Sequence, residues 1–162
     1  MVVREAQVGD FDAIAEITNP YILNTPTHFG YEPVTGDALR DSWTKAAGKF
    51  PFLVMVDGTG GVIGFAKGYQ WRDRAAYERT AEVGIYLREA FHGRGLGRVL
   101  YERLIRACRD KGFHTLVGGI TIPNEASVRL HLSCGFRHVG TFRQVGWKFE
   151  QWHDVGFYQL ML

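Results

Sequence analysis

The chain has 162 residues, which is the length of one domain and is enough to bury a substantial core. Hydrophobic residues make up 46% of it and charged residues 22%, proportions that indicate a water-soluble globular protein and exclude a disordered or fibrous chain. The formal net charge of +2 is too small to indicate a surface for nucleic acid, so we expect no nucleic-acid partner.

Cysteine use and apolar runs predict where the protein works. Cys108 and Cys134 show neither a disulfide pattern nor a metal-ligand spacing, which is typical of reduced thiols. The first residues contain no apolar signal core, and no apolar run reaches the ~18 residues of a membrane-spanning helix. We therefore expect a cytoplasmic protein with no membrane partner and no bound metal.

The N-terminal third is expected to be largely helical. After a short strand at residues 2–6, Asp10 is expected to cap a helix with Phe11, Ile14 and Ile17 facing inward. This helix should end near Asn19-Pro20, because the residue before a proline disfavours helical geometry. Residues 21–33 form an aromatic-rich irregular segment that either lines a pocket or is partly buried under the core. A second helix is predicted at residues 35–47.

The remainder alternates between strands and helices. Two strands flank the turn sequence Asp57-Gly-Thr-Gly-Gly61, which is a strong hairpin signal. The predicted strands are residues 50–56, 62–70, 82–87, 115–122, 136–142 and 155–162, and the predicted helices are residues 96–111 and 123–134. We find no repeat and no linker, so residues 1–162 are expected to form a single α+β domain with a central sheet of six or seven strands.

The stretch from Glu82 to Lys111 combines a strand, a basic glycine loop and an amphipathic helix. Unpaired N–H groups and the positive end of the dipole at a helix N-terminus attract phosphate, and glycines let the anion come close. The loop Gly93-x-Gly95-x-Gly97 is neither a P-loop nor a full dinucleotide fingerprint. Read by itself, it indicates either a phosphate site or merely a tight strand-to-helix turn.

The loop resembles the pyrophosphate-binding loop of the GNAT superfamily of acetyl-CoA-dependent N-acetyltransferases, with His92 where Gln or Arg is usual. The order of predicted elements is also that of the GNAT fold, so the resemblance covers nearly the whole chain. A second signature is Asn124-x-x-Ser127-x-x-x-His131-x-x-x-Gly-Phe, with His131 in place of the superfamily's Tyr. That replacement, with the motif from Val145 to Gln159, is similar to the phosphinothricin and methionine sulfoximine acetyltransferases.

The resemblance implies a GNAT fold with a mixed, mostly antiparallel sheet of six or seven strands and about four helices. It implies acetyl-CoA as acetyl donor, with the pantetheine arm pairing as an added strand against the backbone of Ile85, Tyr86 and Leu87. The residues expected to bind the pyrophosphate and pantetheine are Gly93, Arg94, Gly95, Leu96, Gly97, Arg98, Asn124 and Ser127.

Acetyl transfer to an ammonium group requires a base, and Glu82 occupies the position of the subfamily's base. Apolar surroundings would raise the pKa of its carboxyl group toward the working pH, whereas a lone Glu on a strand more often faces solvent. His131 shares a helix face with Ser127 and Asn124, and we expect it either to protonate the leaving thiolate or to be the partner of Glu82. A buried core position is the alternative for such a histidine.

The acceptor is expected to be a small amino-acid analogue such as phosphinothricin, methionine sulfoximine or methionine sulfone. The resemblance assigns its binding to the loop Arg72, Asp73 and Arg74, where guanidinium groups hold oxygens in bidentate fashion, although a solvated charge run is an equal alternative. Tyr77 and Phe29 are expected to wall the pocket beside Glu82. Alternative functions are acetylation of a protein N-terminus or a polyamine, or acyl-CoA sensing without catalysis.

Aromatic residues crowd the last sixteen positions or so of the chain: Trp147, Phe149, Trp152, Phe157 and Tyr158. They either close the core of the subunit or form an interface, since aromatic residues are enriched at interface cores. Members of the resembled subfamily are commonly homodimers. We therefore expect a homodimer whose C-terminal segment lies at the interface and borders the active site.

Overall fold

The computed structural model describes all residues from 1 to 162. Its seven strands form one sheet in the order β1-β2-β3-β4-β5-β7-β6, and all neighbours are antiparallel except β4 and β5. This confirms the GNAT fold predicted from the sequence. The strands are β1 (Val2–Glu5), β2 (Phe52–Val56), β3 (Val62–Gln70), β4 (Thr80–Leu87), β5 (Thr115–Ile122), β6 (Arg137–Lys148) and β7 (Gln151–Met161).

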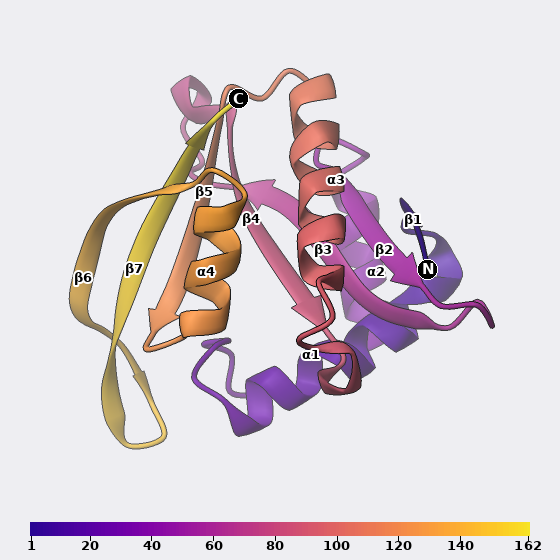
Figure 1. The fold of residues 1–162 in the computed structure, drawn as a ribbon, viewed down its shortest axis with the longest axis horizontal. Helices are drawn as coiled ribbons and strands as arrows, with labels where there is room; N and C mark the ends of the chain where they lie inside the picture. The colour runs from indigo at the N-terminus through magenta and orange to yellow at the C-terminus, as the bar shows by residue number, and fades with distance from the viewer.

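Four α-helices cover the two faces of the sheet (Figure 1). The helices α3 (Leu96–Asp110) and α4 (Glu125–Ser133) lie on one face, and α1 (Phe11–Asn24) and α2 (Gly36–Lys45) lie on the other. Three 3₁₀ turns complete the structure: Val8–Asp10, Ala75–Tyr77 and Glu89–Phe91. None of the helices combines the length and the apolar character needed to span a membrane.

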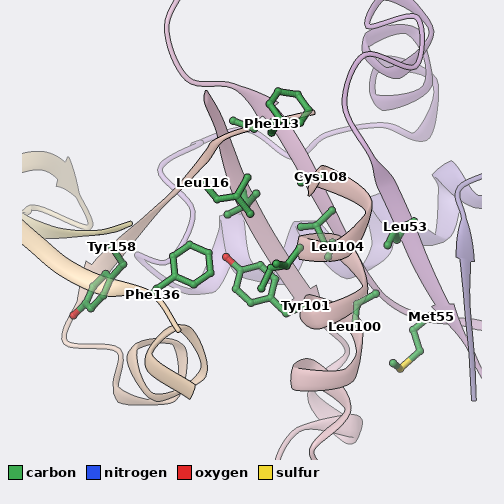
Figure 2. Close-up of a cluster of buried hydrophobic side chains, with 14 of the residues drawn as sticks. Leu53, Met55, Leu100, Tyr101, Leu104, Cys108, Phe113, Leu116, Phe136 and Tyr158 are labelled. Carbon is green, nitrogen blue, oxygen red and sulfur yellow. The ribbon is translucent and has the colours of Figure 1, made fainter. Parts of the chain in front are cut away.

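Alternation of side chains along the strands divides the core into two clusters. Leu53 and Met55 of β2 point toward α3, whereas Val54 and Val56 point toward α1. The α3 cluster includes Tyr101, whose ring stacks on that of Phe136 at 5.6 Å between ring centres. Tyr158 lies beyond Phe136 (Figure 2). Residues of β4 obey the same rule, so the odd positions face α3 and the even positions face α1.

Two features of α1 differ from the prediction. The helix does not end at Pro20 but continues to Asn24, because it buries Ile17 and Ile22 on one side while Pro20 lies on the exposed side. Asp10 makes no side-chain bond to the helix N-terminus. Its carboxylate instead accepts hydrogen bonds from Arg4 at 2.7 and 2.8 Å and from the backbone of Gln7 at 2.7 Å.

The C-terminal hairpin is longer than predicted, since β6 continues to Lys148 and β7 begins at Gln151. Residues 143–154 were expected to lie outside the strands. The turn between β6 and β7 is formed by Phe149 and Glu150, both with positive φ (52° and 56°). Hairpin turns of this kind usually carry Asn-Gly or similar pairs, so the sequence lacks the usual signal.

Candidate active site

The parallel pair β4–β5 opens into a fork at Glu82. The two strands pair only from Thr80 to Glu82 opposite Thr115 to Val117, and Figure 1 shows them diverging beyond that point. The edge of β4 from Val83 to Leu87 is therefore free on the β5 side, which leaves backbone N–H and C=O groups for an added strand. This is the geometry expected for pantetheine binding.

A cleft of about 610 Å³ extends from this fork to the start of α3. Of the residues predicted to bind the cofactor, those lining the cleft are Ile85, Leu87, Gly93, Gly95, Leu96, Gly97, Arg98, Asn124 and Ser127. Tyr86 points to the opposite face of the sheet, as strand alternation requires, so only its backbone faces the fork. Arg94 does not line the cleft, because its guanidinium lies over the ring of Phe91 at 5.4 Å.

The glycine loop presents the N-terminus of α3 to the cleft. Gly93 and Gly95 both have φ of +73°, and Gly95 is the N-cap of α3. A Cβ atom at Gly97 would approach Leu87 to 3.2 Å, so this glycine allows the helix to pack closely on β4. These residues fit a pyrophosphate group, since the free amides of the first turn face an open cleft.

His92 anchors the beginning of the loop. Its Nε2 lies 3.0 Å from both the carbonyl oxygen of Leu87 and the hydroxyl of Tyr21, and that hydroxyl donates a 2.6 Å hydrogen bond to the same carbonyl. One backbone acceptor of the β4 edge, the carbonyl oxygen of Leu87, is therefore already hydrogen-bonded within the protein. These contacts hold His92, at the position where Gln or Arg is usual, against α1 and β4.

Asn124 caps α4, and its side-chain oxygen accepts a 3.1 Å hydrogen bond from the backbone of Ser127. Both residues line the cleft, whereas His131, one turn further along α4, does not. Of the three side chains that the sequence predicted near one ligand, only those of Asn124 and Ser127 therefore line the cleft.

His131 lies in the core, 4% exposed, behind Gly118 of β5. Its Nδ1 is 2.8 Å from the carbonyl oxygen of Ser127, and its Nε2 is 2.9 Å from the hydroxyl of Tyr101. Since a carbonyl only accepts, Nδ1 carries the proton and Nε2 accepts from Tyr101. Burial lowers the pKa of His131, which favours this neutral form.

Glu82 lies at the fork and faces the α1–α2 side of the sheet, half-buried. A Cβ atom at Gly119 would lie 3.5 Å from its Oε1, so the carboxylate sits directly beside β5. Burial raises the pKa of Glu82, and the hydroxyl of Tyr69 and the charge of Arg72 oppose this shift. A half-buried carboxylate with a raised pKa is a candidate for proton transfer.

The second cavity, of about 500 Å³, lies on the α1–α2 side and contains Glu82; we call it the acceptor cavity. Thr27 and Thr121 line both this cavity and the cofactor cleft, so the two are neighbours. Of the predicted acceptor residues, Phe29 and Arg72 line it as well. Tyr77 instead lines a separate groove with Trp71, and Asp73 and Arg74 are exposed and line neither.

The roof of the acceptor cavity is the segment between α1 and α2, fixed by the C-terminal hairpin. The ammonium group of Lys148, 2% exposed, donates to the carbonyl oxygens of Ile22, Thr25 and His28. The hydroxyl of Tyr31 donates to the carbonyl oxygen of Trp147. Residues separated by more than a hundred positions therefore hold the roof together, which no local pattern of the sequence could reveal.

Comparisons with known proteins assign the chain to a family. The sequence model described as "Acetyltransferase (GNAT) family" matches residues 14–136. The chain belongs to the GNAT acetyltransferase family. Phosphinothricin N-acetyltransferase of Streptomyces viridochromogenes is 37% identical to this GNAT enzyme, over 97% of the chain and 85% of that protein. The L-methionine sulfoximine/L-methionine sulfone acetyltransferase of Pseudomonas aeruginosa is 38% identical, over 99% and 94%.

Solved structures show the same fold. The Salmonella typhimurium acetyltransferase with its cofactor acetyl-CoA superposes with a TM-score of 0.96 at 37% identity, covering 100% of this chain and 94% of that one. The Sinorhizobium meliloti phosphinothricin acetyltransferase in complex with acetyl-CoA gives 0.95 at 30%, covering 99% and 88%. A ribosomal-protein-alanine N-acetyltransferase from Brucella melitensis gives 0.96 at 32%, covering both chains fully. This GNAT enzyme is an N-acetyltransferase that uses acetyl-CoA.

Sequence reasoning missed several residues of the site. Tyr69 and Thr121 line the acceptor cavity, and His28 lies in its roof. Tyr69 could have been found from strand register, because it is the direct partner of Glu82 across β3 and β4. No group of three or more His, Cys, Asp or Glu side chains is gathered as a metal site requires.

Proposed function

We propose that the enzyme acetylates the α-amino group of a small amino-acid analogue such as phosphinothricin, methionine sulfoximine or methionine sulfone, with Glu82 as general base. The observation that carries this proposal is the position of Glu82 at the fork, inside the acceptor cavity and beside the cofactor cleft. The names of the two relatives support a small acceptor.

In the proposed reaction, the ammonium group of the acceptor gives a proton to Glu82. The free amine then attacks the thioester carbonyl carbon, and the new C–N bond replaces the C–S bond. The nitrogen loses a second proton as it becomes the amide nitrogen, and coenzyme A leaves as a thiolate that takes up one proton. Glu82 is suited to its part because burial raises its pKa toward that of a useful base. Donation of the final proton by His131 stays a prediction, and the buried, doubly hydrogen-bonded ring lines neither cavity.

Arg72 is proposed to bind an anionic group of the acceptor near Glu82. It lines the acceptor cavity, and its charge acts on the carboxylate of Glu82. Its guanidinium lies over the ring of Trp71 at 4.1 Å, which restricts its orientation. Contact of Asp73, Arg74 and Tyr77 with the acceptor stays a prediction, since Tyr77 lines a neighbouring groove and the other two line neither surface.

The rival acceptor is a protein N-terminus, because the Brucella melitensis neighbour is a ribosomal-protein-alanine N-acetyltransferase. A polyamine is disfavoured, since the cationic side chain of Arg72 would repel it inside the cavity. The test is a panel of free amino acids, phosphinothricin, methionine sulfone, an alanine-starting peptide and spermidine, with thiol release from acetyl-CoA as the signal. Turnover of the peptide alone would contradict the proposal.

The homodimer and its interface are also proposed, on the basis of the C-terminal hairpin. Trp147, Phe149 and Trp152 are 49%, 50% and 56% exposed, and Phe142 and Val145 beside them are exposed too. Only Tyr158 of the predicted aromatic group is buried in the core. So many exposed rings on neighbouring strands are typical of an interface between copies of a chain.

Residues 1–162 are proposed to act as one catalytic domain, because a single sheet carries all seven strands. The cytoplasm as the place of action stays a prediction of the sequence.

A further inference from the structure

A smaller cavity lies beside the acceptor cavity on the α1–α2 side of the sheet. It measures about 220 Å³ and shares the side chains of His28, Tyr69 and Tyr86 with the acceptor cavity. Its remaining walls are mostly apolar, from α1, α2 and β3. One flexible cationic side chain reaches into it, that of Lys67 in β3.

Lys67 has no anionic partner in the protein. It forms no ion pair and no hydrogen bond, and its ammonium lies over the rings of Phe52, at 5.7 Å from the ring centre, and Tyr69, at 5.6 Å. Burial alone lowers the pKa of Lys67, with no carboxylate acting against it. Rings stabilise a cation less than a charge-assisted hydrogen bond does, so the charge is incompletely compensated.

The carboxylate of Glu82 does not compensate Lys67 either. The cation that acts on Glu82 is Arg72, and Lys67 makes no contribution there. The other titratable group facing Lys67 from the roof is His28, whose pKa is lowered by burial and then by the charges of Lys148 and Lys67. Lys67 thus faces neutral groups and free space.

The strand register places Lys67 and Arg72 on opposite sides of Glu82. Lys67 is paired with Gly84, and Tyr69 is paired with Glu82, so Lys67 lies two residues, or roughly 7 Å, further along the strand axis. Arg72 follows the other end of β3. Gly84 lines the smaller cavity, and a Cβ atom there would lie 3.7 Å from the ring of Tyr69 and 3.8 Å from that of Tyr86, so these two shared rings stand between the cavities.

We propose that Lys67 is a specificity-determining residue that binds an anionic group of the acceptor, so that the acceptor amine at Glu82 is held between two cations. The preferred substrates are then α-amino acids with an anionic group, either the α-carboxylate or a side-chain phosphinate or carboxylate, that reaches the smaller cavity. This inference rests on the proposed function, because it assumes that an amino acid occupies the acceptor cavity.

The experiment compares the KM of three acceptors in wild type and Lys67→Met: phosphinothricin, methionine sulfone and the amide of methionine sulfone. The KM of at least one acid is expected to rise by about 10- to 100-fold, the usual effect of losing a charge-assisted hydrogen bond. The KM of acetyl-CoA and the kcat at saturation should stay unchanged, which a general loss of structure would not allow.

The pattern of KM changes across the three acceptors shows which anionic group Lys67 binds. A rise for phosphinothricin alone assigns Lys67 to the side-chain phosphinate, and a rise for both acids but not for the amide assigns it to the α-carboxylate. Lys67→Arg, which keeps the charge, should retain most of the affinity. The matched control is Lys49→Met, because Lys49 is exposed and also lies over a ring, that of Phe50 at 5.4 Å.

An unchanged KM for both acids in Lys67→Met overturns the inference and leaves the proposed function standing. A wild-type enzyme that acetylates neither acid overturns the proposed acceptor class, and the inference falls with it. Should Lys67→Met fail to fold, Lys67→Gln gives the same comparison, since it removes the charge and keeps a polar end.

Discussion

The cofactor cleft and the acceptor cavity are built in different ways. The cleft is lined mainly by two continuous stretches, residues 85–98 and 121–130. The acceptor cavity is lined by side chains from the roof, β3, β4, β5 and the C-terminal hairpin, which are distant in sequence. The donor side is thus a local property of the chain, whereas the acceptor side depends on how the whole sheet is assembled.

The chemistry of the two sides differs accordingly. The cleft offers backbone amides, positive-φ glycines and an open strand edge, none of which depends on particular side chains. The acceptor cavity offers Glu82, Arg72 and the neighbouring Lys67, whose identities decide what is bound. Substitutions should therefore separate into those that weaken acetyl-CoA binding and those that change acceptor use.

The largest effect is expected for Glu82→Gln, at the boundary between the two sides. Loss of the base should lower kcat by about 10²- to 10⁴-fold at neutral pH, and the deficit should shrink as pH rises because free amine becomes abundant. A steady-state pH–rate series measures this. The wild-type rate should fall at low pH as Glu82 becomes protonated, and a variant with the wild-type profile would remove Glu82 from the mechanism.

Glu82→Gln should lower activity but should not lower the stability of the fold. The pKa of Glu82 is raised in the folded protein, so its charged form is disfavoured by folding, and the resulting loss of stability grows as pH rises through the folded pKa. Glu82→Gln should therefore unfold at an equal or higher temperature than wild type at neutral pH. A lower melting temperature there would mean that the loss of activity reflects damage to the fold.

The second effect concerns the cofactor side alone. Gly95→Asp should weaken acetyl-CoA binding by about 10-fold or more relative to Gly95→Asn, because a carboxylate would face the pyrophosphate at the helix N-terminus. Asp and Asn are similar in shape and both tolerate positive φ, so the pair differs in charge and not in backbone strain. Calorimetry measures the affinities, and equal values would contradict the assignment of the loop.

Next in size is the effect of Trp147→Ala, which tests whether the acceptor side depends on assembly. The proposed homodimer should dissociate by about 10-fold more readily, since a large ring is removed from the interface. Acceptor KM should rise with it, because Phe142 and Val145 of the same hairpin line the acceptor cavity. Analytical ultracentrifugation measures the dimer.

The control for Trp147→Ala is Val8→Ser, at an equally exposed apolar position beside β1, the opposite edge of the sheet. It should leave both assembly and KM unchanged. A wild-type protein that sediments as a monomer at micromolar concentration would end the proposal of a homodimer.

The smallest effect is expected for His131 and appears as a pH dependence of stability. Because burial lowers the pKa of His131 in the folded state, its contribution to stability is present above the unfolded pKa of about 6.5 and is lost as pH falls through the folded pKa. His131→Gln should flatten this part of the stability curve, measured by urea unfolding between pH 5 and pH 8. A large loss of kcat in fully folded His131→Gln would instead support the prediction that His131 donates the final proton.

The fold could be predicted from the sequence, and most of the residues assigned to the cofactor line one cleft, because the glycine loop and the Asn124 cap are local patterns with a fixed geometry. Glu82 and Arg72, both assigned to the acceptor from the sequence, line one cavity, and their roles stay predictions. The sequence could not predict the surroundings of His131, since its partner Tyr101 lies thirty positions away on another helix. Nor could it predict that Lys67 lines a small cavity without an anionic partner, because that cavity is formed by helices and strands that are distant in sequence.

The three carbonyl oxygens bound by Lys148 also order the assembly of the protein in time. They belong to residues 22–28, whereas Lys148 lies at least 120 positions further along the chain and is therefore synthesised later. Closing a loop of this length costs conformational entropy before the contact forms, so the roof becomes fixed late. A nascent chain can thus complete its cofactor loop before it has an acceptor cavity, and it acquires a defined choice of substrate only when the C-terminal hairpin has docked.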